Sequence, residues 1–200
     1  MIGIVDYEAG NISSVANALS TIQAQFLVSG EPSMLLTCDG IILPGVGAAP
    51  GAMAALHHRK LPDFLSHCTK PVLGICLGMQ LLYQSSEEGQ TACLGIFPGV
   101  IKRFDESRQK VPHMGWNEVI QRGKNPLLNG IHEKEYFYFA HSYFAETDAI
   151  TFATSSQVGI FAAAVAKNNY YGVQFHPEKS GKAGLKILQN FEALCKSYRQ

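Results

Sequence analysis

The sequence predicts an α/β fold: a largely parallel sheet with helices on both faces, carrying an antiparallel extension. In the first 85 residues, short apolar runs alternate with stretches of helical periodicity, which is the pattern of a helix-covered parallel sheet. From about residue 97 onward the strand-like runs are separated only by turns, which favours antiparallel or mixed pairing. No linker or low-complexity segment divides the 200 residues, so we expect a single domain over residues 1–200.

In the first half of the chain, apolar runs bounded by turns predict buried strands. These strands are Ile2–Val5, Gln25–Ser29, Gly40–Pro44 and Pro71–Ile75. Apolar residues at helical spacing predict the helices Ile12–Ile22, Gly51–His58, Leu61–His67 and Leu77–Tyr83. After a turn at Glu8–Asn11, either Asn11 or Ser13 is placed to cap the first helix.

In the second half, strand-like runs predict an array of short strands that ends in a helix. The runs are Val100–Phe104, Asn117–Ile120, Tyr136–Ala140, Ile150–Ala153, Phe161–Val165 and Tyr170–Phe175. Apolar residues at helical spacing then predict a terminal helix over Ala183–Leu194.

The composition excludes several classes of protein. Sixteen basic residues balance 16 acidic ones, so the chain lacks the basic footprint of a general nucleic-acid-binding protein. No apolar run approaches the roughly 20 residues that span a bilayer, so we expect no membrane association. The first residues carry no basic segment, and Asp6 interrupts their apolar run, so we expect no signal peptide and a cytoplasmic location.

The five cysteines are odd in number and irregular in spacing, so we expect free thiols in a reducing compartment. No Cys or His pair has zinc-ligand spacing, and we expect neither a metal site nor a cofactor. Four of these cysteines have no catalytic setting, and we interpret them as packing or surface residues: Cys38, Cys68, Cys93 and Cys195.

Cys76 is the candidate nucleophile, because G-I-C-L-G at 74–78 joins a predicted strand directly to a predicted helix. This is the cysteine counterpart of the nucleophile elbow, in which a sharp turn projects the side chain above the sheet edge. Flanking glycines clear space around it, and the helix N-terminus favours a thiolate. The N–H of Leu77 is placed to donate to an oxyanion. The alternative is that Cys76 is a small buried hydrophobic residue.

His176 and Glu178 are the candidate base and its orienting carboxylate. They follow the predicted strand Tyr170–Phe175, and residues two apart on a strand share a face. A thiol nucleophile needs a base that takes and returns a proton, and the base needs a carboxylate to fix its tautomer. Taken alone, His176 before Pro177 is equally consistent with a turn residue.

Together, G-I-C-L-G-M-Q at 74–80 and F-H-P-E at 175–178 resemble the class I (triad-type) glutamine amidotransferases over nearly the whole chain. Three further stretches are most similar to the glutaminase subunits of imidazole glycerol phosphate synthases: D-Y-x-x-G-N at 6–11, P-G-V-G at 44–47 and P-H-M-G-W-N at 112–117. The resemblance implies a flavodoxin-like open mixed sheet. It also implies hydrolysis of glutamine to glutamate and ammonia through a γ-glutamyl thioester on Cys76.

The resemblance also implies roles for further residues. His176 is the acid/base and Glu178 its orienter. The oxyanion hole falls on Gly45, Val46, Gly47 and Leu77, with a peptide at Val46 that can turn when needed. The glutamine site falls on Gln80, Glu88, His141, Ser142 and Tyr143, with Glu88 holding the α-ammonium group. For Gln80 and Glu88 the alternative is a capped or solvated helix end.

The resemblance implies a partner as well. The sequence has no Walker motif and no G-x-G-x-x-G after a strand, so ammonia made here has no evident acceptor site in this chain. The implied partner is a (β/α)-barrel cyclase subunit, forming a heterodimer that makes imidazole glycerol phosphate and AICAR in histidine biosynthesis. The interface candidates are Trp116, Asn11 and Lys179, with a buried tryptophan beneath a hairpin as the alternative for Trp116.

Other functions stay open on the sequence alone. The chain could serve a different synthase, act as a stand-alone γ-glutamyl cysteine hydrolase, or be a non-catalytic binding module. The remaining histidines show no chemistry in the sequence: His57 and His58 end a predicted helix, and His67, His113 and His132 have no evident partner.

Overall fold

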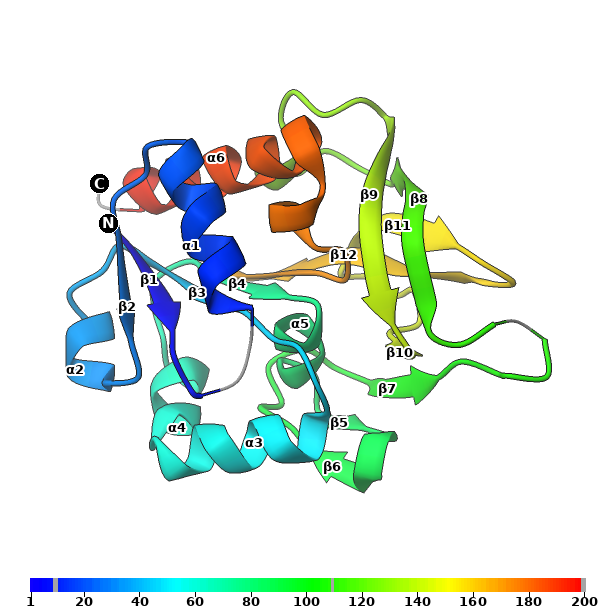
Figure 1. Cartoon of the computed structure of the whole chain (residues 1–200), viewed down its shortest axis with the longest axis horizontal. Coiled ribbons are helices and arrows are strands. Elements are labelled where there is room, and N and C mark those ends of the chain that lie inside the picture. Colours follow the sequence, from blue (N-terminus) through cyan, green and yellow to red (C-terminus); the bar gives the residue numbers. More distant parts are fainter. Residues whose placement is uncertain (9–10, 109, 199–200) are drawn as a thin grey trace.

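A computed structural model describes residues 1–8, 11–108 and 110–198. Within these residues, a nine-stranded sheet runs through the molecule in the order β2-β1-β3-β4-β13-β12-β11-β8-β9 (Figure 1). Its strands are β1 (Ile2–Val5), β2 (Phe26–Ser29), β3 (Gly40–Leu43), β4 (Val72–Ile75), β8 (His113–Gln121), β9 (Lys134–His141), β11 (Thr151–Ser156), β12 (Ile160–Lys167) and β13 (Tyr170–Val173). The turn predicted at Glu8–Asn11 falls partly on residues 9–10, which lie outside the described residues.

The sheet has a parallel part and an antiparallel part. Strands β2, β1, β3, β4 and β13 pair in parallel, and β12, β11, β8 and β9 continue the sheet with antiparallel pairs. The predicted change of pairing is therefore confirmed. Strand β13 is the junction, since it runs parallel to β4 and antiparallel to β12. Periodicity could not show that β13 enters the sheet between β4 and β12. This position places residues 170–173 beside residues 72–75.

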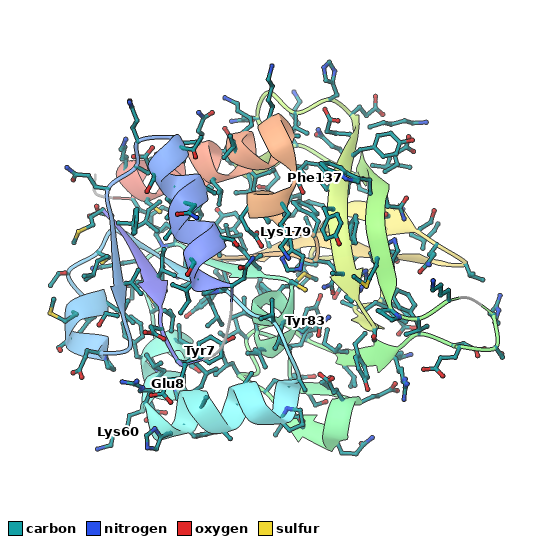
Figure 2. The ribbon with its side chains drawn as sticks, in the orientation of Figure 1. Tyr7, Glu8, Lys60, Tyr83, Phe137 and Lys179 are labelled. Atoms are coloured by element: carbon teal, nitrogen blue, oxygen red, sulfur yellow. The ribbon has the colours of Figure 1, made fainter. Side chains whose placement is uncertain are left out.

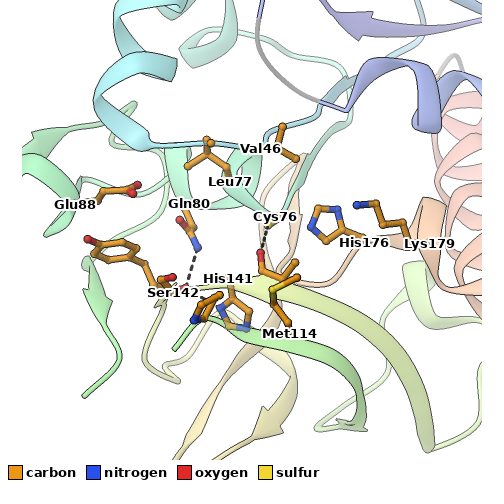
Figure 3. Close-up of a pocket in the computed structure, with 14 residues that line it drawn as sticks. Val46, Cys76, Leu77, Gln80, Glu88, Met114, His141, Ser142, His176 and Lys179 are labelled. Atoms are coloured by element: carbon orange, nitrogen blue, oxygen red, sulfur yellow. Dashed lines mark hydrogen bonds between the residues drawn. The ribbon is translucent and has the colours of Figure 1, made fainter. Parts of the chain in front are cut away.

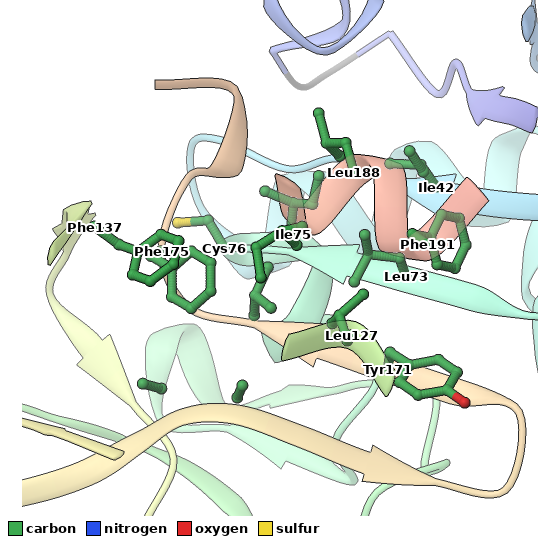
Figure 4. Packing of buried hydrophobic residues seen from close by; sticks show 14 of the residues in the cluster. Ile42, Leu73, Ile75, Cys76, Leu127, Phe137, Tyr171, Phe175, Leu188 and Phe191 are labelled. Carbon is green, nitrogen blue, oxygen red and sulfur yellow. The ribbon is translucent and has the colours of Figure 1, made fainter. Parts of the chain in front are cut away.

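Helices cover both faces of the parallel part, as predicted. Helices α1 (Ile12–Thr21) and α6 (Gly181–Ser197) pack on one face, against a cluster that includes Leu73 and Ile75 (Figure 4). Helices α3 (Ala49–His58), α4 (Leu61–Ser66) and α5 (Leu77–Leu81) pack on the other, against Val72. Alternate residues of one strand thus supply two cores. No helix in the described part of the chain is long and apolar enough to cross a membrane.

A second, smaller sheet lies beside the antiparallel part, in the order β10-β7-β5-β6. Its strands are β5 (Ser85–Ser86), β6 (Thr91–Ala92), β7 (Val100–Arg103) and β10 (Tyr143–Phe144). Of these four strands, β7 alone was predicted. The helix α2 (Pro32–Leu35) and the short turns η1 (Glu88–Gln90), η2 (Pro126–Leu128) and η3 (Pro177–Lys179) were also missed. Such elements are too short to show a periodicity.

Candidate active site

Cys76 lies at the sharp turn between β4 and α5, as predicted for a nucleophile elbow. Its φ of 53° and ψ of −110° are strained for a residue with a side chain. Close packing holds this conformation, since a Cβ on Gly78 would lie 1.9 Å from the Leu43 carbonyl oxygen. A Cβ on Gly74 would lie 2.7 Å from the carbonyl oxygen of Gly78. The glycines therefore make room for the helix backbone on the sheet, rather than around the Cys76 side chain as predicted.

His176 reaches this turn because β13 pairs with β4. The N–H of Cys76 donates to the carbonyl oxygen of Val173 at 2.8 Å, which extends the ladder between the two strands. Just beyond, the N–H of His176 donates to Tyr138 in β9 at 2.9 Å. The Ser180 hydroxyl donates to the His176 carbonyl at 2.6 Å and accepts the Tyr138 N–H at 3.0 Å. These bonds hold the imidazole beside the Cys76 sulfur (Figure 3), so the structure brings together the two residues whose meeting was predicted.

Glu178 orients the imidazole. Nδ1 of His176 donates to Oε1 of Glu178 at 2.8 Å, and Nδ2 of Asn11 donates to the same oxygen at 3.0 Å. The side chains of His176 and Glu178 are 2% and 0% exposed. Neither predicted cap forms at α1: Asn11 occupies the N-cap position without a side-chain cap bond, since its amide is directed to Glu178.

The neighbours of His176 favour its protonated form. Burial by itself lowers the pKa of the imidazole, because a low dielectric disfavours charge. Hydrogen bonding and charge interactions with Cys76 and Glu178 outweigh burial and raise this pKa to about 10. Nε2 of His176 is buried and forms no well-aligned hydrogen bond within the described residues, so its contact with the thiol is loose. Such loose contacts are common in sites without substrate.

Cys76 and His176 open into a cavity of about 260 Å³ (Figure 3). Most of the predicted site residues line it: Val46, Gly47, Leu77, Gln80, Glu88, His141, Ser142, Tyr143 and Lys179. Gly45 does not, because it packs under α5, where a Cβ would lie 2.5 Å from the backbone nitrogen of Gly78. The cavity is below the range of about 300–1,000 Å³ typical of drug-sized ligands, so it suits a small substrate.

The loop between β3 and α3, residues 44–48, is fastened at both ends. At its start, the Tyr7 hydroxyl donates to the Pro44 carbonyl at 2.8 Å. Tyr7 is fully buried between the end of β1 and α3 (Figure 2), and burial raises the pKa of its hydroxyl, which therefore stays a donor. At the loop's end, the N–H of Ala49 donates to Oε2 of Glu88 at 2.7 Å. Tyr7 was not among the predicted site residues, because its role depends on a contact between separate strands.

Between these two anchors the loop is free to present its backbone to the cavity. Val46 is 40% exposed there, and Gly47 has a φ of +96°, which favours glycine. Glu88 combines the two alternatives considered for it: one carboxylate oxygen caps α3 while the residue lines the cavity.

Gln80 lies one turn after Cys76, as predicted, and its backbone N–H donates to the Cys76 carbonyl at 3.2 Å. Its side chain is buried and donates to the Tyr143 carbonyl at 2.9 Å and to Oε1 of Gln174 at 3.0 Å. Nε2 of Gln174 in turn lies 3.7 Å from the Cys76 sulfur. Gln174 was not predicted as a site residue. The available signal was its position two residues before His176, on the same face of the strand.

Comparison with known proteins identifies the family. The family model described as glutamine amidotransferase class-I matches residues 3–194. The chain belongs to the class I glutamine amidotransferases. Among its curated relatives, this amidotransferase is 47% identical to imidazole glycerol phosphate synthase subunit HisH from Methanosarcina acetivorans, over 96% of the chain and 98% of the relative. It is 43% identical to the same subunit from Bacillus cytotoxicus, over 100% of the chain and 97% of the relative.

Solved structures agree with the class I amidotransferase fold. The structure of PurLQS from Thermotoga maritima matches with a TM-score of 0.75 at 20% identity, over 100% of this chain and 98% of that one. At this identity the likeness concerns the fold, and the predicted open mixed sheet is confirmed.

Two buried histidines pair at the wall of the amidotransferase cavity, which gives His113 a partner that was not evident in the sequence. Nδ1 of His141 pairs with the Tyr143 carbonyl at 2.8 Å, so this nitrogen is the donor. Nε2 of His141 must then accept from Nδ1 of His113, at 2.9 Å, and Nδ2 of Asn117 donates to Nε2 of His113 at 3.2 Å. Every ring nitrogen is satisfied with both histidines neutral. Burial lowers the pKa of both imidazoles, that of His141 to about 3.

Trp116 is exposed on the outer face of the amidotransferase, so the buried alternative is excluded. Its side chain is 57% exposed and packs edge-on against Tyr138, at 6.3 Å between ring centroids. Met114 and Tyr136 are also exposed on these two paired strands. Nζ of Lys179 lies 5.8 Å from the centre of the Tyr138 ring. Met114 and Lys179 also line the cavity (Figure 3). The aromatic surface formed by Trp116, Tyr136 and Tyr138 therefore lies next to the rim of the site.

The other cysteines are placed as predicted for packing or surface residues. Cys38, Cys68 and Cys195 are buried, and Cys93 is half-buried; all are free thiols. Within residues 1–8, 11–108 and 110–198, no group of three or more His, Cys, Asp or Glu side chains is arranged to hold a metal ion.

Proposed function

We propose that the chain is the glutaminase subunit of an imidazole glycerol phosphate synthase, folded as a single domain. It hydrolyses L-glutamine to glutamate and ammonia for a cyclase subunit in histidine biosynthesis. The observation that carries the proposal is full-length similarity to subunit HisH, at 43–47% identity in the two relatives described. The convergence of Cys76, His176 and Glu178 at the cavity supports it chemically.

In the proposed reaction, the Cys76 thiolate attacks the γ-carboxamide carbon of glutamine, its thiol proton having passed to His176. The carbonyl oxygen becomes an oxyanion, and His176 returns the proton to the leaving nitrogen as the carbon–nitrogen bond breaks. Ammonia leaves, and a γ-glutamyl thioester remains on Cys76. A water molecule activated by His176 then hydrolyses the thioester to glutamate, which restores the thiol. Glu178 holds the imidazole in the required tautomer throughout.

The oxyanion is stabilised by backbone donors. Leu77 begins α5, so its N–H has no acceptor inside the helix and the helix N-terminus adds partial positive charge. The loop Gly45–Gly47 supplies the second donor when the peptide at Val46 turns into the cavity. The anchors at Tyr7 and Glu88 confine that movement to the loop.

The end of the glutamine that carries the α-ammonium group is held at the side of the cavity far from His176. The Glu88 carboxylate lines the cavity and is the group placed to accept the α-ammonium. His141, Ser142 and Tyr143 form the facing wall. Gln80 contributes mainly by holding neighbouring protein groups rather than by contacting the substrate, because both of its amide protons are donated to Tyr143 and Gln174.

The ammonia has to reach its acceptor without entering water, where near pH 7 it would be almost wholly protonated. A cyclase subunit docked on the aromatic surface, as a heterodimer, meets this need. Trp116 and Lys179 are the proposed contacts. Asn11 is half-buried and bonded to Glu178, so as an interface residue it would link the partner directly to the site. We place the pair in the cytoplasm.

Glutaminase assays with and without the cyclase and its nucleotide ligand test the function. We expect little turnover by the free chain and strong turnover in the liganded complex. Cys76→Ala should abolish glutamine-dependent synthesis and leave synthesis from added ammonium intact. Full activity of the free chain would instead favour a stand-alone hydrolase, and stimulation by another synthase alone would reassign the partner. Loss of ammonium-dependent synthesis in Cys76→Ala would contradict the division of labour between the subunits.

A further inference from the structure

A buried chain of side-chain amides ends on the Cys76 sulfur. It begins at the backbone carbonyl of Tyr143, passes through Gln80, and reaches the sulfur through Gln174 (Figure 3 shows its first bond). Gln80 and Gln174 are 4% and 0% exposed, so solvent does not compete for these bonds.

The direction of each amide follows from the first bond. A backbone carbonyl can only accept, so the group of Gln80 that faces Tyr143 must be its NH₂. The second proton of this NH₂ points to Gln174, at 3.0 Å, which requires the oxygen of Gln174 to face Gln80. The NH₂ of Gln174 is thereby turned to the sulfur, at 3.7 Å.

The fold places Gln174 there through strand pairing. Val173 pairs with Ile75, so the next residues along the two parallel strands, Gln174 and Cys76, are neighbours. The N–H of Gln174 continues the pairing with β12 by donating to Ala163 at 2.9 Å. The backbone of Gln174 is therefore fixed by both neighbouring strands, independently of its side chain.

We propose that Gln174 is a further catalytic residue, which stabilises the Cys76 thiolate through its side-chain NH₂, and that Gln80 is a positioning residue that fixes the direction of this amide. The inference rests on the proposed function for its use in glutamine hydrolysis. The contact itself is a property of the described residues.

The thiol and the thiolate of Cys76 form different hydrogen bonds with these neighbours. As a thiol, Cys76 donates to the Ala140 carbonyl at 3.7 Å. When the proton passes to His176, the sulfur becomes an acceptor and Gln174 is the buried neutral donor that faces it. A hydrogen bond to a charged group is stronger than one to a neutral group. Gln174 therefore favours the ionised sulfur without giving up a proton, whereas His176 changes its own charge.

The test compares alkylation of Cys76 by iodoacetamide in the full chain, followed by mass spectrometry of the peptide that carries it. For Gln174→Met we expect the rate at neutral pH to fall by about tenfold or more, because a donor to a charged group is lost. The profile of rate against pH should move to higher pH. Gln80→Met keeps the donor but not its direction, so a smaller fall of about two- to tenfold is expected.

Gln121→Met is the matched control, since Gln121 also donates to backbone carbonyls, those of Ile131 and His132, but at a distance from the cavity. Its alkylation rate should equal that of the wild type. Gln174→Glu is the second variant, because it preserves the shape of Gln174 and replaces the donor by a carboxylate. It should also slow alkylation at neutral pH, because the carboxylate lacks the donor and its charge disfavours a thiolate beside it.

In the liganded complex, Gln174→Met should lower kcat by a similar factor and leave KM for glutamine within about threefold, since its amide contacts the sulfur rather than the substrate. Alkylation rates within about twofold of wild type in folded Gln174→Met and Gln174→Glu would overturn the proposal, as would a normal rate in Gln174→Glu alone. Alkylation needs no glutamine, so it decides this inference even if the chain proves not to be a glutaminase.

Discussion

The two histidines that line the cavity differ in charge state, although strands of one sheet position both. His176 follows the last parallel strand and faces Glu178 and Cys76, which raise its pKa to about 10. His141 lies in the antiparallel part, pairs with neutral groups, and has its pKa lowered to about 3, first by burial. Both side chains are nearly fully buried. Burial acts on both imidazoles in the same direction, so the difference in charge comes from the neighbours of His176.

This difference matches a division of labour between the two parts of the sheet. The parallel part ends in charged, hydrogen-bonded groups that can move a proton. The antiparallel part supplies a neutral, fully satisfied wall around His113 and His141, and an exposed aromatic outer face around Trp116. We infer that the parallel part carries the chemistry, while the antiparallel part supplies the segment that contacts the substrate and the surface that contacts the partner.

The largest expected effect comes from removing the charged histidine. His176→Ala should lower glutamine-dependent turnover by about 10³-fold or more, because His176 is the group placed beside Cys76 to take the thiol proton. Synthesis from added ammonium by the complex should be unchanged. His57→Ala, at the exposed end of α3, is the control and should leave both activities unchanged. If His176→Ala retained most of its glutaminase activity, the parallel part would not hold the chemistry.

The same comparison shows what could be predicted from the sequence. The elbow at Cys76 and the pair His176 and Glu178 lie in short contiguous motifs, so the sequence predicted both. The strands of the parallel part were also predicted within a few residues, because buried runs bounded by turns are a strong local signal.

Contacts between distant residues could not be predicted. Gln174 meets Cys76 across 98 positions, and Asn11 meets Glu178 across 167. Both depend on where β13 enters the sheet, which no local pattern records. The pairing of His113 with His141 similarly depends on the register of β8 and β9, so these two histidines had no evident connection in the sequence.

The next expected effect concerns the outer face of the antiparallel part. Trp116→Ala should weaken assembly with the cyclase by about 2 kcal/mol or more, about a 30-fold rise in Kd, if Trp116 is an interface anchor. Calorimetric titration of the two subunits measures this. Tyr198→Ala is the control, since Tyr198 is similarly exposed, at 49%, but follows α6 away from this face. Equal affinities of wild type and Trp116→Ala for the cyclase would show that the partner does not bind at this surface.

The comparison also predicts a pH dependence of stability, with opposite contributions from the two histidines. An unfolded histidine has a pKa near 6.5. The folded pKa of His176 lies above this value, so its contribution is complete below about pH 6.5 and is lost as the pH rises toward 10. The folded pKa of His141 lies below it, so its contribution is complete above about pH 6.5 and is lost as the pH falls toward 3.

Urea unfolding across this pH range measures both limbs, each with a slope of at most about 1.4 kcal/mol per pH unit for one proton. His176→Ala should flatten the alkaline limb only, and His141→Phe the acid limb only. Subtracting each variant's curve from that of the wild type removes the contribution of the carboxylates, which titrate in both proteins. If His141→Phe left the acid limb unchanged, the folded protein would tolerate a charged His141, and the contrast between the two sides of the cavity would not hold.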